Sequence, residues 1–193
     1  MCVVHSDEAL AKIFPLCRMM PNKAEKSAGE SFMPSAPRTL DDLVAIHSVS
    51  QLKARYFRFM DTKQWDLWEA LYTPDAMLDA RDDGPAMAKL GFPAPPADAL
   101  LFRTGKGIRQ AVSTALEGVR TVHHGHMGEF EILAPDRIKA IWAMQDIIRY
   151  PAGAPTPIQG FDGFGHYEDH YVYRDDKWLI ESVKLTRLVL MPV

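Results

Sequence analysis

Apolar residues along the chain first recur at helical spacing and later alternate with polar residues. Between residues 39 and 61 the apolar positions fall three or four apart, which predicts one long amphipathic helix with Thr39 as its N-cap. The same spacing predicts a shorter second helix over residues 65–72 and a third over residues 106–117, with Gly118 as its C-terminal stop. The helices are therefore expected to come before most of the sheet.

The period changes at residue 120, where alternation of apolar and polar residues predicts long β-strands. An earlier short strand is expected over residues 76–80. The proline-rich stretch that follows it, residues 81–103, is expected to be irregular and to serve as a lid or an interface. The four long strands are expected over residues 120–133, 137–150, 161–174 and 177–190. This order predicts an α+β domain, with three N-terminal helices packed on one face of a curved antiparallel β-sheet.

Residues 1–38 differ in composition from the remainder of the 193-residue chain. Their second half is rich in serine, alanine, glycine, proline and charge, and so offers few apolar side chains to bury. We therefore expect residues 1–38 to form a partly flexible N-terminal extension. Residues 39–193 are expected to form one domain, because that length supports a substantial core.

The composition argues against several functional classes. The formal net charge is -3 and the pI is about 6.1, whereas a nucleic-acid surface needs clustered positive charge. No apolar run approaches the roughly 20 residues that cross a bilayer, and the N-terminus does not resemble a secretory signal. The two cysteines, Cys2 and Cys17, form no metal or redox motif. We therefore expect a cytoplasmic protein without a nucleic-acid or membrane partner.

The residues of greatest chemical interest are an aspartate and a histidine that lie far apart in the sequence. Asp61 ends the predicted first helix, and His123 lies near the start of the first long strand. A carboxylate that orients an imidazole makes a general base that works near neutral pH. Tyr56 precedes Asp61 by five residues, so the two side chains project about 140° apart on a helix. They share a pocket only if Asp61 lies at a frayed helix end; otherwise Tyr56 is a core residue and Asp61 simply ends the helix.

Three neighbouring histidines raise the question of a metal site. Strand alternation places His124 and His126 on one face and His123 on the other, so the three do not converge on one ion. The apolar residues that follow share a face with His124 and His126, and a β-bulge at Gly125 or Gly128 is needed to turn His123 inward. We therefore choose His123 as the base, keep His126 as a second pocket candidate, and expect no metal.

A second set of possible ligands, His166, Glu168 and His170, alternates along one face of a later strand. That spacing could hold a metal ion. Residues of this type on a strand more commonly form a solvated or intersubunit surface, however. We favour the surface interpretation for these three residues.

Two charged residues, Asp146 and Arg187, interrupt otherwise apolar strands. A buried charge without a partner is costly, so each is expected either in the pocket with a partner or on the polar face of its strand. In a pocket, Arg187 would polarise a carbonyl or carboxylate, and Asp146 would assist proton transfer. The candidate apolar walls, which core packing explains equally well, are Trp142, Met144, Ile148, Phe161, Phe164 and Tyr167.

The order of helices and long strands resembles the SnoaL-like branch of the nuclear-transport-factor-2-like (NTF2-like) superfamily. Three segments carry the resemblance, namely residues 54–61 with Trp65, residues 121–127, and residues 165–188. The resemblance extends over about residues 39–191. It implies a cone-shaped NTF2-like fold for almost all of the patterned chain.

The resemblance also implies roles for the candidate residues. Asp61 and His123 match the aspartate–histidine dyads of scytalone dehydratase and lindane dehydrochlorinase. The similarity is closer to the bacterial bile-acid dehydratases, in which a pocket tyrosine, histidine, aspartate and arginine match Tyr56, His123, Asp146 and Arg187. Two departures concern the substrate. A second pocket tyrosine of the bile-acid dehydratases falls at Ala80 here, and the tyrosine before the dyad aspartate of scytalone dehydratase falls at Met60.

These observations predict a cofactor-independent lyase or isomerase of dehydratase type. His123 would remove a proton next to a carbonyl of a hydrophobic ring compound such as a steroid, polyketide or terpenoid. No dinucleotide fingerprint or nucleophile elbow occurs, which agrees with chemistry that needs no cofactor. The alternatives are a non-catalytic ligand-binding or assembly module and an accessory subunit of a ring-hydroxylating oxygenase. A homo-oligomer, dimer or trimer, is expected from the exposed sheet face.

Overall fold

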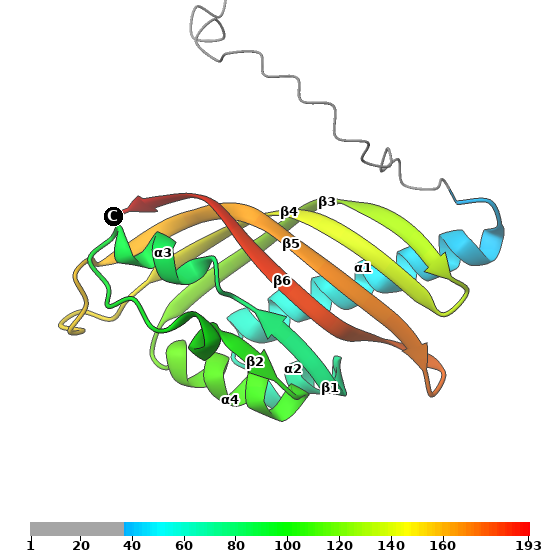
Figure 1. Cartoon of the computed structure of the whole chain (residues 1–193), viewed down its shortest axis with the longest axis horizontal. Coiled ribbons are helices and arrows are strands. Elements are labelled where there is room, and N and C mark those ends of the chain that lie inside the picture. Colours follow the sequence, from blue (N-terminus) through cyan, green and yellow to red (C-terminus); the bar gives the residue numbers. More distant parts are fainter. Residues whose placement is uncertain (1–36) are drawn as a thin grey trace, which may run out of the picture. The chain divides into compact units, whose positions relative to one another are not determined.

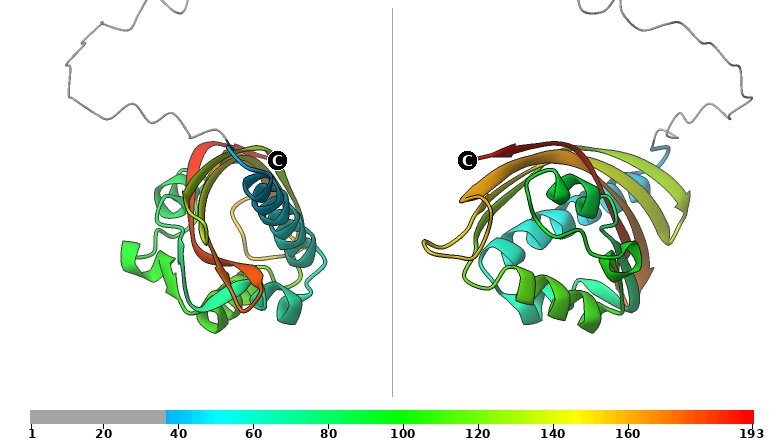
Figure 2. Two further views of the ribbon diagram at one scale, coloured as in Figure 1. Left: turned by 90° about the vertical axis from the view of Figure 1, so that its right-hand side faces the viewer. Right: turned by 60° about the vertical axis from the view of Figure 1, so that its left-hand side comes forward.

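The structure is a computed structural model, and it describes residues 37–193. Almost all of the expected N-terminal extension, residues 1–36, lies outside the described residues. The described part contains helices and a six-stranded sheet that curves over the long first helix (Figures 1 and 2). The expected α+β class with a curved sheet is confirmed. None of the helices within residues 37–193 combines the length and apolar character needed to cross a bilayer.

The first helix, α1 (Leu40–Asp61), begins where the sequence predicts. Thr39 is its N-cap and accepts a hydrogen bond from the Asp42 backbone N–H, while the Asp42 side chain accepts one from the Thr39 N–H. This reciprocal capping box satisfies amide groups that the first helical turn leaves unpaired. The prediction that the second helix runs over residues 65–72 is wrong, because α2 (Trp65–Glu69) stops earlier. Tyr72 instead begins β1 (Tyr72–Asp79), which pairs with the last strand.

The proline-rich stretch 81–103 is more regular than predicted. It contains α3 (Asp83–Ala88), the 3-10 helix η3 (Ala97–Leu100) and the short strand β2 (Leu101–Arg103). Pro85 is tolerated in α3 because it lies in the first turn, where backbone N–H groups have no helical acceptor. α3 packs against the last strand of the sheet (Figure 1). The fourth helix, α4 (Gly105–Ala115), then packs against β1 and α2.

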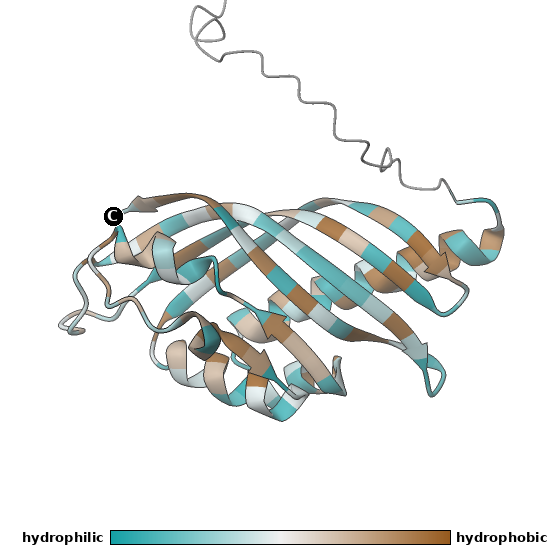
Figure 3. Ribbon diagram, viewed as in Figure 1, coloured by the Kyte–Doolittle hydropathy of each residue, from teal (hydrophilic) through white to brown (hydrophobic). Residues whose placement is uncertain are grey.

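The sheet order is β2-β1-β6-β5-β4-β3, and only β1 and β6 run parallel among these neighbours. Bands of hydrophobic and hydrophilic residues alternate along the long strands (Figure 3), because successive side chains point to opposite faces. The inner face packs against the helices. The long strands are β3 (Arg120–Ala134), β4 (Arg137–Arg149), β5 (Gly160–Arg174) and β6 (Lys177–Pro192).

A β-bulge in β3 decides which histidine faces inward. Gly125 lies opposite Met144 and Gly128 lies opposite Trp142, so three steps along β3 match two along β4. The extra residue reverses the parity of β3. As a result, His123 before the bulge and the apolar residues after it share the inner face, as the bulge hypothesis required.

The core lies between the inner face of the sheet and the helices. α1, α2 and α4 each contribute side chains that are almost completely buried, and these meet residues from β4 and β6. Burying such residues supplies roughly 1.5–3 kcal/mol each relative to exposure, so the helices are held firmly on the sheet. Among the best-buried members of this core are Val49, Leu52, Trp68, Ile108, Ile138 and Ile180.

Candidate active site

Asp61 and His123, 62 positions apart in the chain, meet where the end of α1 approaches the start of β3. The His123 Nδ1 lies 2.6 Å from Asp61 Oδ1, and the backbone N–H of His123 donates to Asp61 Oδ2 at 2.8 Å. The hydroxyl of Thr121 also donates to Asp61 Oδ1, at 2.8 Å. Lys63 Nζ in turn donates to Thr121 Oγ1 at 3.0 Å. The carboxylate of Asp61 is therefore held by a set of donors from one short segment of β3.

These contacts set the protonation of the pair. Burial raises the pKa of Asp61, but hydrogen bonds and charge from His123, with help from Thr121, outweigh burial and hold that pKa below its usual value. An ionised carboxylate only accepts hydrogen bonds, so Nδ1 of His123 must carry a hydrogen. The neutral imidazole then keeps its basic lone pair on Nε2. This is the tautomer that a histidine needs to remove a proton.

Asp61 reaches His123 because it is the last residue of α1, and Thr62 is the C-cap. The requirement that Asp61 lie at the helix end is therefore met. Phe57, one turn earlier, stacks on the imidazole with ring centroids 6.4 Å apart and an interplanar angle of 9°. A Cβ at Gly125 would overlap the Phe57 ring, so a glycine at this position makes room for the stacking partner.

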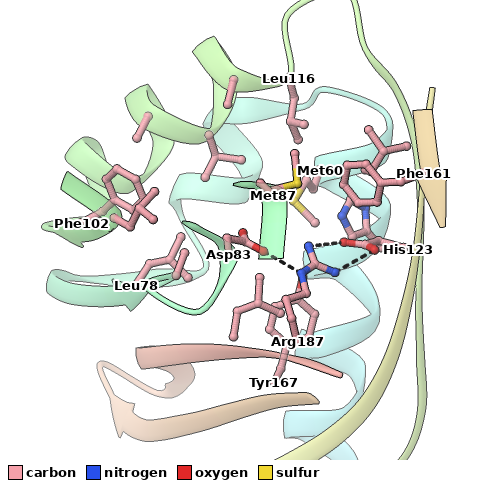
Figure 4. Close-up of a pocket in the computed structure, with 18 of the residues that line it drawn as sticks. Met60, Leu78, Asp83, Met87, Phe102, Leu116, His123, Phe161, Tyr167 and Arg187 are labelled. Atoms are coloured by element: carbon pink, nitrogen blue, oxygen red, sulfur yellow. Dashed lines mark hydrogen bonds and ion pairs between the residues drawn. The ribbon is translucent and has the colours of Figure 1, made fainter. Parts of the chain in front are cut away.

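A second charged cluster lies on the inner face of the sheet, centred on Arg187 of β6. Its Nη1 and Nη2 donate to the two carboxylate oxygens of Asp146 at 2.8 and 2.7 Å. Its Nε donates to Asp83 Oδ1 at 2.6 Å. Figure 4 shows the guanidinium of Arg187 beside the carboxyl group of Asp83. Of the two alternatives for Arg187 and Asp146, this geometry agrees with a paired arrangement in the pocket and not with the polar face of a strand.

The cluster depends on a glycine. A Cβ at Gly163 would overlap Asp146 Oδ1 and crowd Arg187 Nη1. Gly163 lies directly opposite Asp146 in the ladder between β4 and β5. Any side chain at this position would occupy the space in which the carboxylate and the guanidinium meet, so Gly163 permits the ion pair to form over β5.

His123 and the Arg187 cluster line one cavity of about 260 Å³. Its walls are mostly apolar and come from α1, α3, η3, α4 and the strands, including the sequence-predicted residues Ile148, Phe161 and Tyr167. The polar groups that interrupt these walls are His123, Asp146, Arg187, Asp83, Tyr56, Tyr150 and Tyr167. A few polar groups converging in an apolar cavity is the usual composition of a small-molecule site.

The tyrosines of the cavity act as neutral hydrogen-bonding groups. Burial raises the pKa of Tyr56 far above its usual value, with a further contribution from Asp169. Burial likewise raises the pKa of Tyr167 and, more moderately, that of Tyr150. Each phenol therefore keeps its hydrogen at physiological pH and can donate it to an oxygen of a ligand.

Four residues that the sequence suggested for the pocket do not line this cavity. Trp142 and Met144 are buried on the inner face of β4, but Trp142 Nε1 donates to the Tyr171 hydroxyl at 3.2 Å and Met144 Sδ lies 3.9 Å from Arg187 Nη1. Phe164 is three residues from Phe161, so strand alternation turns it to the opposite face. The fourth, His126, lies in the exposed bulge of β3.

The sequence reasoning missed three residues of the site: Asp83, Tyr150 and Gly163. Gly163 had a usable signal, because a glycine inside a strand often marks a close approach. Asp83 and Tyr150 had none, since Asp83 meets Arg187 across 104 positions of the chain. Within residues 37–193 there is no group of three or more His, Cys, Asp or Glu side chains placed to hold a metal ion.

A family model described as the SnoaL-like domain matches residues 41–184. The chain belongs to the SnoaL-like family. The chain is also 29% identical over 143 residues to "Probable cyclase FGR4" of Gibberella zeae. The aligned region covers 72% of this chain and 89% of that protein. The family assignment agrees with the resemblance noted in the sequence.

Solved structures of the NTF2-like superfamily share the fold of this SnoaL-like domain. A hexachlorocyclohexane dehydrochlorinase, LinA type 2, superposes with a TM-score of 0.63 and 15% identity, covering 80% of this chain and 92% of that chain. The "Putative Scytalone Dehydratase" of Novosphingobium aromaticivorans superposes with a TM-score of 0.63 and 16% identity, covering 79% of this chain and 90% of that chain. At these identities the similarity shows the fold alone.

Proposed function

We propose that this SnoaL-like protein is a cofactor-independent enzyme of the lyase or isomerase type, in which His123 removes a proton next to a carbonyl of a small hydrophobic ring compound. The observation that carries the proposal is the 2.6 Å contact between His123 Nδ1 and Asp61 in the wall of an apolar cavity. Asp61 fixes the tautomer of His123 and stabilises the imidazolium that forms when Nε2 accepts the proton.

The enolate that follows needs hydrogen-bond donors near its oxygen. The neutral phenols of Tyr56, Tyr167 and Tyr150 line the same cavity and can donate to it. Arg187 is less suited to this task than the sequence suggested, because three of the five N–H groups of its guanidinium already point to Asp83 and Asp146. In our proposal the tyrosines stabilise the enolate, and Arg187 holds the two carboxyl groups in place.

The size of the cavity narrows the substrate class. A cavity of about 150 Å³ accommodates benzene, so about 260 Å³ suits a compound of one or two rings. A four-ring steroid exceeds this volume. Of the three classes considered, small polyketide or terpenoid rings fit better than steroids.

The names of the relatives are compatible with one shared first step. The Gibberella zeae relative is named as a probable cyclase, and the structural neighbours include a dehydrochlorinase and a putative dehydratase. All three names suggest chemistry at an acidic C–H bond. An enolate can return its proton elsewhere, expel a neighbouring group, or attack a second carbonyl. Because the last outcome is a cyclisation, proton removal by His123 accommodates all three reaction types.

Exposed apolar residues at the C-terminal end of β6 support the expected homo-oligomer. Leu188 and Val189 of β6 are 68% and 49% exposed, and Met191 and Val193 are also exposed. A protein that serves only as a binding module, or as an accessory subunit of an oxygenase, would share this fold and this surface. The distinction between these functions therefore rests on the chemistry of the cavity.

The test is proton exchange in D₂O, followed by NMR, with one-ring and two-ring ketones as substrates. We expect wild-type protein to exchange hydrogen next to the carbonyl, and His123→Ala to slow that exchange by about 10²-fold or more, the typical contribution of a general base. His124→Ala, an exposed neighbour on the other face of β3, is the matched control. Binding of these ketones without exchange would favour the binding-module alternative and contradict the proposal.

A further inference from the structure

Asp83 places a carboxyl group in the cavity that the proposed base does not need. It is the first residue of α3, and its side chain reaches from that helix toward Arg187 (Figure 4). Its Oδ1 accepts from Arg187 Nε at 2.6 Å, and 27% of its side chain is exposed where it lines the cavity. The neighbouring Asp82 is exposed instead, so the position of Asp83 is specific to that one carboxyl group.

The charges around Arg187 do not balance if both of its partners are ionised. One guanidinium lies between two carboxyl groups, and the cavity around them is largely apolar. Asp146 receives a bidentate contact through both oxygens, the geometry that best stabilises an ionised carboxylate. Asp83 receives a single contact to Oδ1. Ionisation of both carboxyl groups would leave an unbalanced negative charge in this apolar environment, which is costly. We therefore expect the cluster to retain one proton, and we place that proton on Oδ2 of Asp83.

We propose that Asp83 is the general acid of this enzyme and donates a proton to a hydroxyl group that leaves the substrate. This inference rests on the proposed function, because it needs His123 to supply the electron pair. It makes the substrate a neutral β-hydroxy ketone and the net reaction a dehydration. A substrate carboxylate is disfavoured, since Asp83 and Asp146 already surround the cationic group.

The step balances as an elimination of water. His123 Nε2 takes the proton on the carbon next to the carbonyl, and the electron pair of that C–H bond forms the new carbon–carbon double bond. The C–O bond to the β-hydroxyl breaks, and the Oδ2 proton of Asp83 passes to the departing oxygen to give water. Asp83 is left as a carboxylate beside Arg187. The proton on His123 returns to Asp83 through solvent, which restores both groups.

The electrostatics of α3 support this role. Burial raises the pKa of Asp83, and it outweighs the opposing effect of Arg187, while Asp146 and Asp82 raise the pKa further. The charged or titratable groups that face Asp83 are Arg187 of β6, Asp146 of β4, Tyr150 after β4, Tyr167 of β5 and Asp82 beside it. A carboxyl group whose pKa is raised keeps its proton to a higher pH than an ordinary aspartate and can donate that proton to a ligand.

The first test follows the proton itself. The ¹³Cγ resonance of Asp83 can be identified in aspartate-labelled protein by its loss in Asp83→Asn and its retention in Asp82→Asn. We expect this resonance to titrate above the ordinary aspartate pKa of about 3.9. Titration at or below the ordinary value would overturn the inference whatever the protein catalyses.

The second test separates the acid from the base. Substrates are 3-hydroxycyclohexanone and 4-hydroxy-2-decalone, with 3-acetoxycyclohexanone as a compound whose leaving group needs no proton. For Asp83→Asn we expect the ratio of eliminated water to exchanged deuterium to fall by about 10²-fold or more. Elimination from the acetoxy compound should fall far less, which a misfolded variant would not show. Asp82→Asn, which leaves both carboxyl groups of the Arg187 cluster in place, should lower this ratio far less than Asp83→Asn.

The outcomes distinguish the two proposals. If wild-type protein exchanges deuterium and Asp83→Asn eliminates the hydroxyl as fast as wild type, the role of Asp83 is wrong and the role of His123 stands. Equal losses on the hydroxy and acetoxy compounds also exclude proton donation by Asp83. If wild-type protein neither exchanges nor eliminates, the proposed function itself fails, and the role of Asp83 that rests on it fails as well.

Discussion

Within residues 37–193, two cations are buried among carboxyl groups, and they are arranged differently. Lys53 of α1 is 1% exposed and pairs with one carboxylate, Asp169 of β5, at 2.7 Å. Arg187 is 7% exposed and is shared between Asp83 and Asp146. The first cation is matched one to one, whereas the second faces an excess of carboxyl groups.

The Lys53–Asp169 pair is enclosed by aromatic side chains, whereas the Arg187 cluster is open to the cavity. Lys53 Nζ lies over the rings of Tyr56 and Tyr167, 4.2 and 3.9 Å from their centroids, and the Tyr171 hydroxyl donates to Asp169 at 2.6 Å. The Arg187 cluster borders the cavity instead. The Lys53–Asp169 pair is buried and balanced in charge, so it is not accessible to a ligand and contributes to the stability of the fold. An open, unmatched cluster can exchange a proton with a ligand.

The largest expected effect tests the structural half of this comparison. Lys53→Met leaves the buried Asp169 without its cation, which should lower the free energy of unfolding by about 3–5 kcal/mol. Arg187→Met should lower it by less, because its carboxyl partners face a cavity and can take up protons. Urea denaturation at neutral pH measures both values.

The double variant Lys53→Met/Asp169→Asn provides the control for that prediction. It removes the charge that Lys53→Met leaves behind, so it should recover part of the lost stability. If Arg187→Met costs as much stability as Lys53→Met, the contrast between the two clusters does not hold.

A smaller effect is expected at Gly163, beneath the Arg187 cluster. Gly163→Ala introduces a Cβ into the space of Asp146 Oδ1, and overpacking of this kind costs about 1–3 kcal/mol. The variant should also lose activity, because the carboxylate and the guanidinium are displaced. The same substitution in an Asp146→Ala background should cost less, since the clash is gone. Equal costs in both backgrounds would show that Gly163 does not act through Asp146.

The smallest expected effect is the pH dependence of stability, which has opposite signs at two aspartates of the site. The folded-state pKa of Asp83 is raised, so its contribution is present below about pH 4 and is lost as the pH rises through that pKa. The folded-state pKa of Asp61 is lowered, so its contribution is present above about pH 4 and is lost as the pH falls through that pKa.

Amide substitutions separate these two contributions. Asp83→Asn should remove a loss of stability on going from acid to neutral pH, whereas Asp61→Asn should destabilise the protein more at neutral than at acid pH. Urea denaturation between pH 3 and pH 8 measures both, with Asp82→Asn as the exposed control. The same sign for both variants would contradict the assignment.

Local sequence signals predicted much of the fold. Thr39 and Asp42 form a cap from residues three positions apart. The strands predicted over residues 161–174 and 177–190 leave a two-residue turn at Asp175 and Asp176, which takes the positive φ angles of 51° and 57° that a tight hairpin requires. These features depend on neighbouring residues only. The errors arose where distant strands intervened, as at Tyr72, which was expected in a helix and pairs with Ile180 of β6.

The candidate site shows the same division. The sequence pointed to Asp61, His123, Asp146 and Arg187 through a family resemblance, and the structure brings these residues to one cavity or its wall. It did not point to Asp83 or Tyr150, because nothing near either residue indicates a distant partner. It also counted Phe164 and His126 toward the pocket, and strand alternation and the β3 bulge turn both away.

The sequence by itself determined the capped first helix, the helix before β3, the four long strands with the turns between them, and the family. These follow from the period of apolar residues and from turn chemistry, which act over a few residues. Only the tertiary structure decided which face His123 occupies, that Arg187 is shared by two carboxyl groups, and that Lys53 is sealed in the core. Those outcomes depend on strand register and on contacts between distant segments, where one extra residue in a bulge reverses a face.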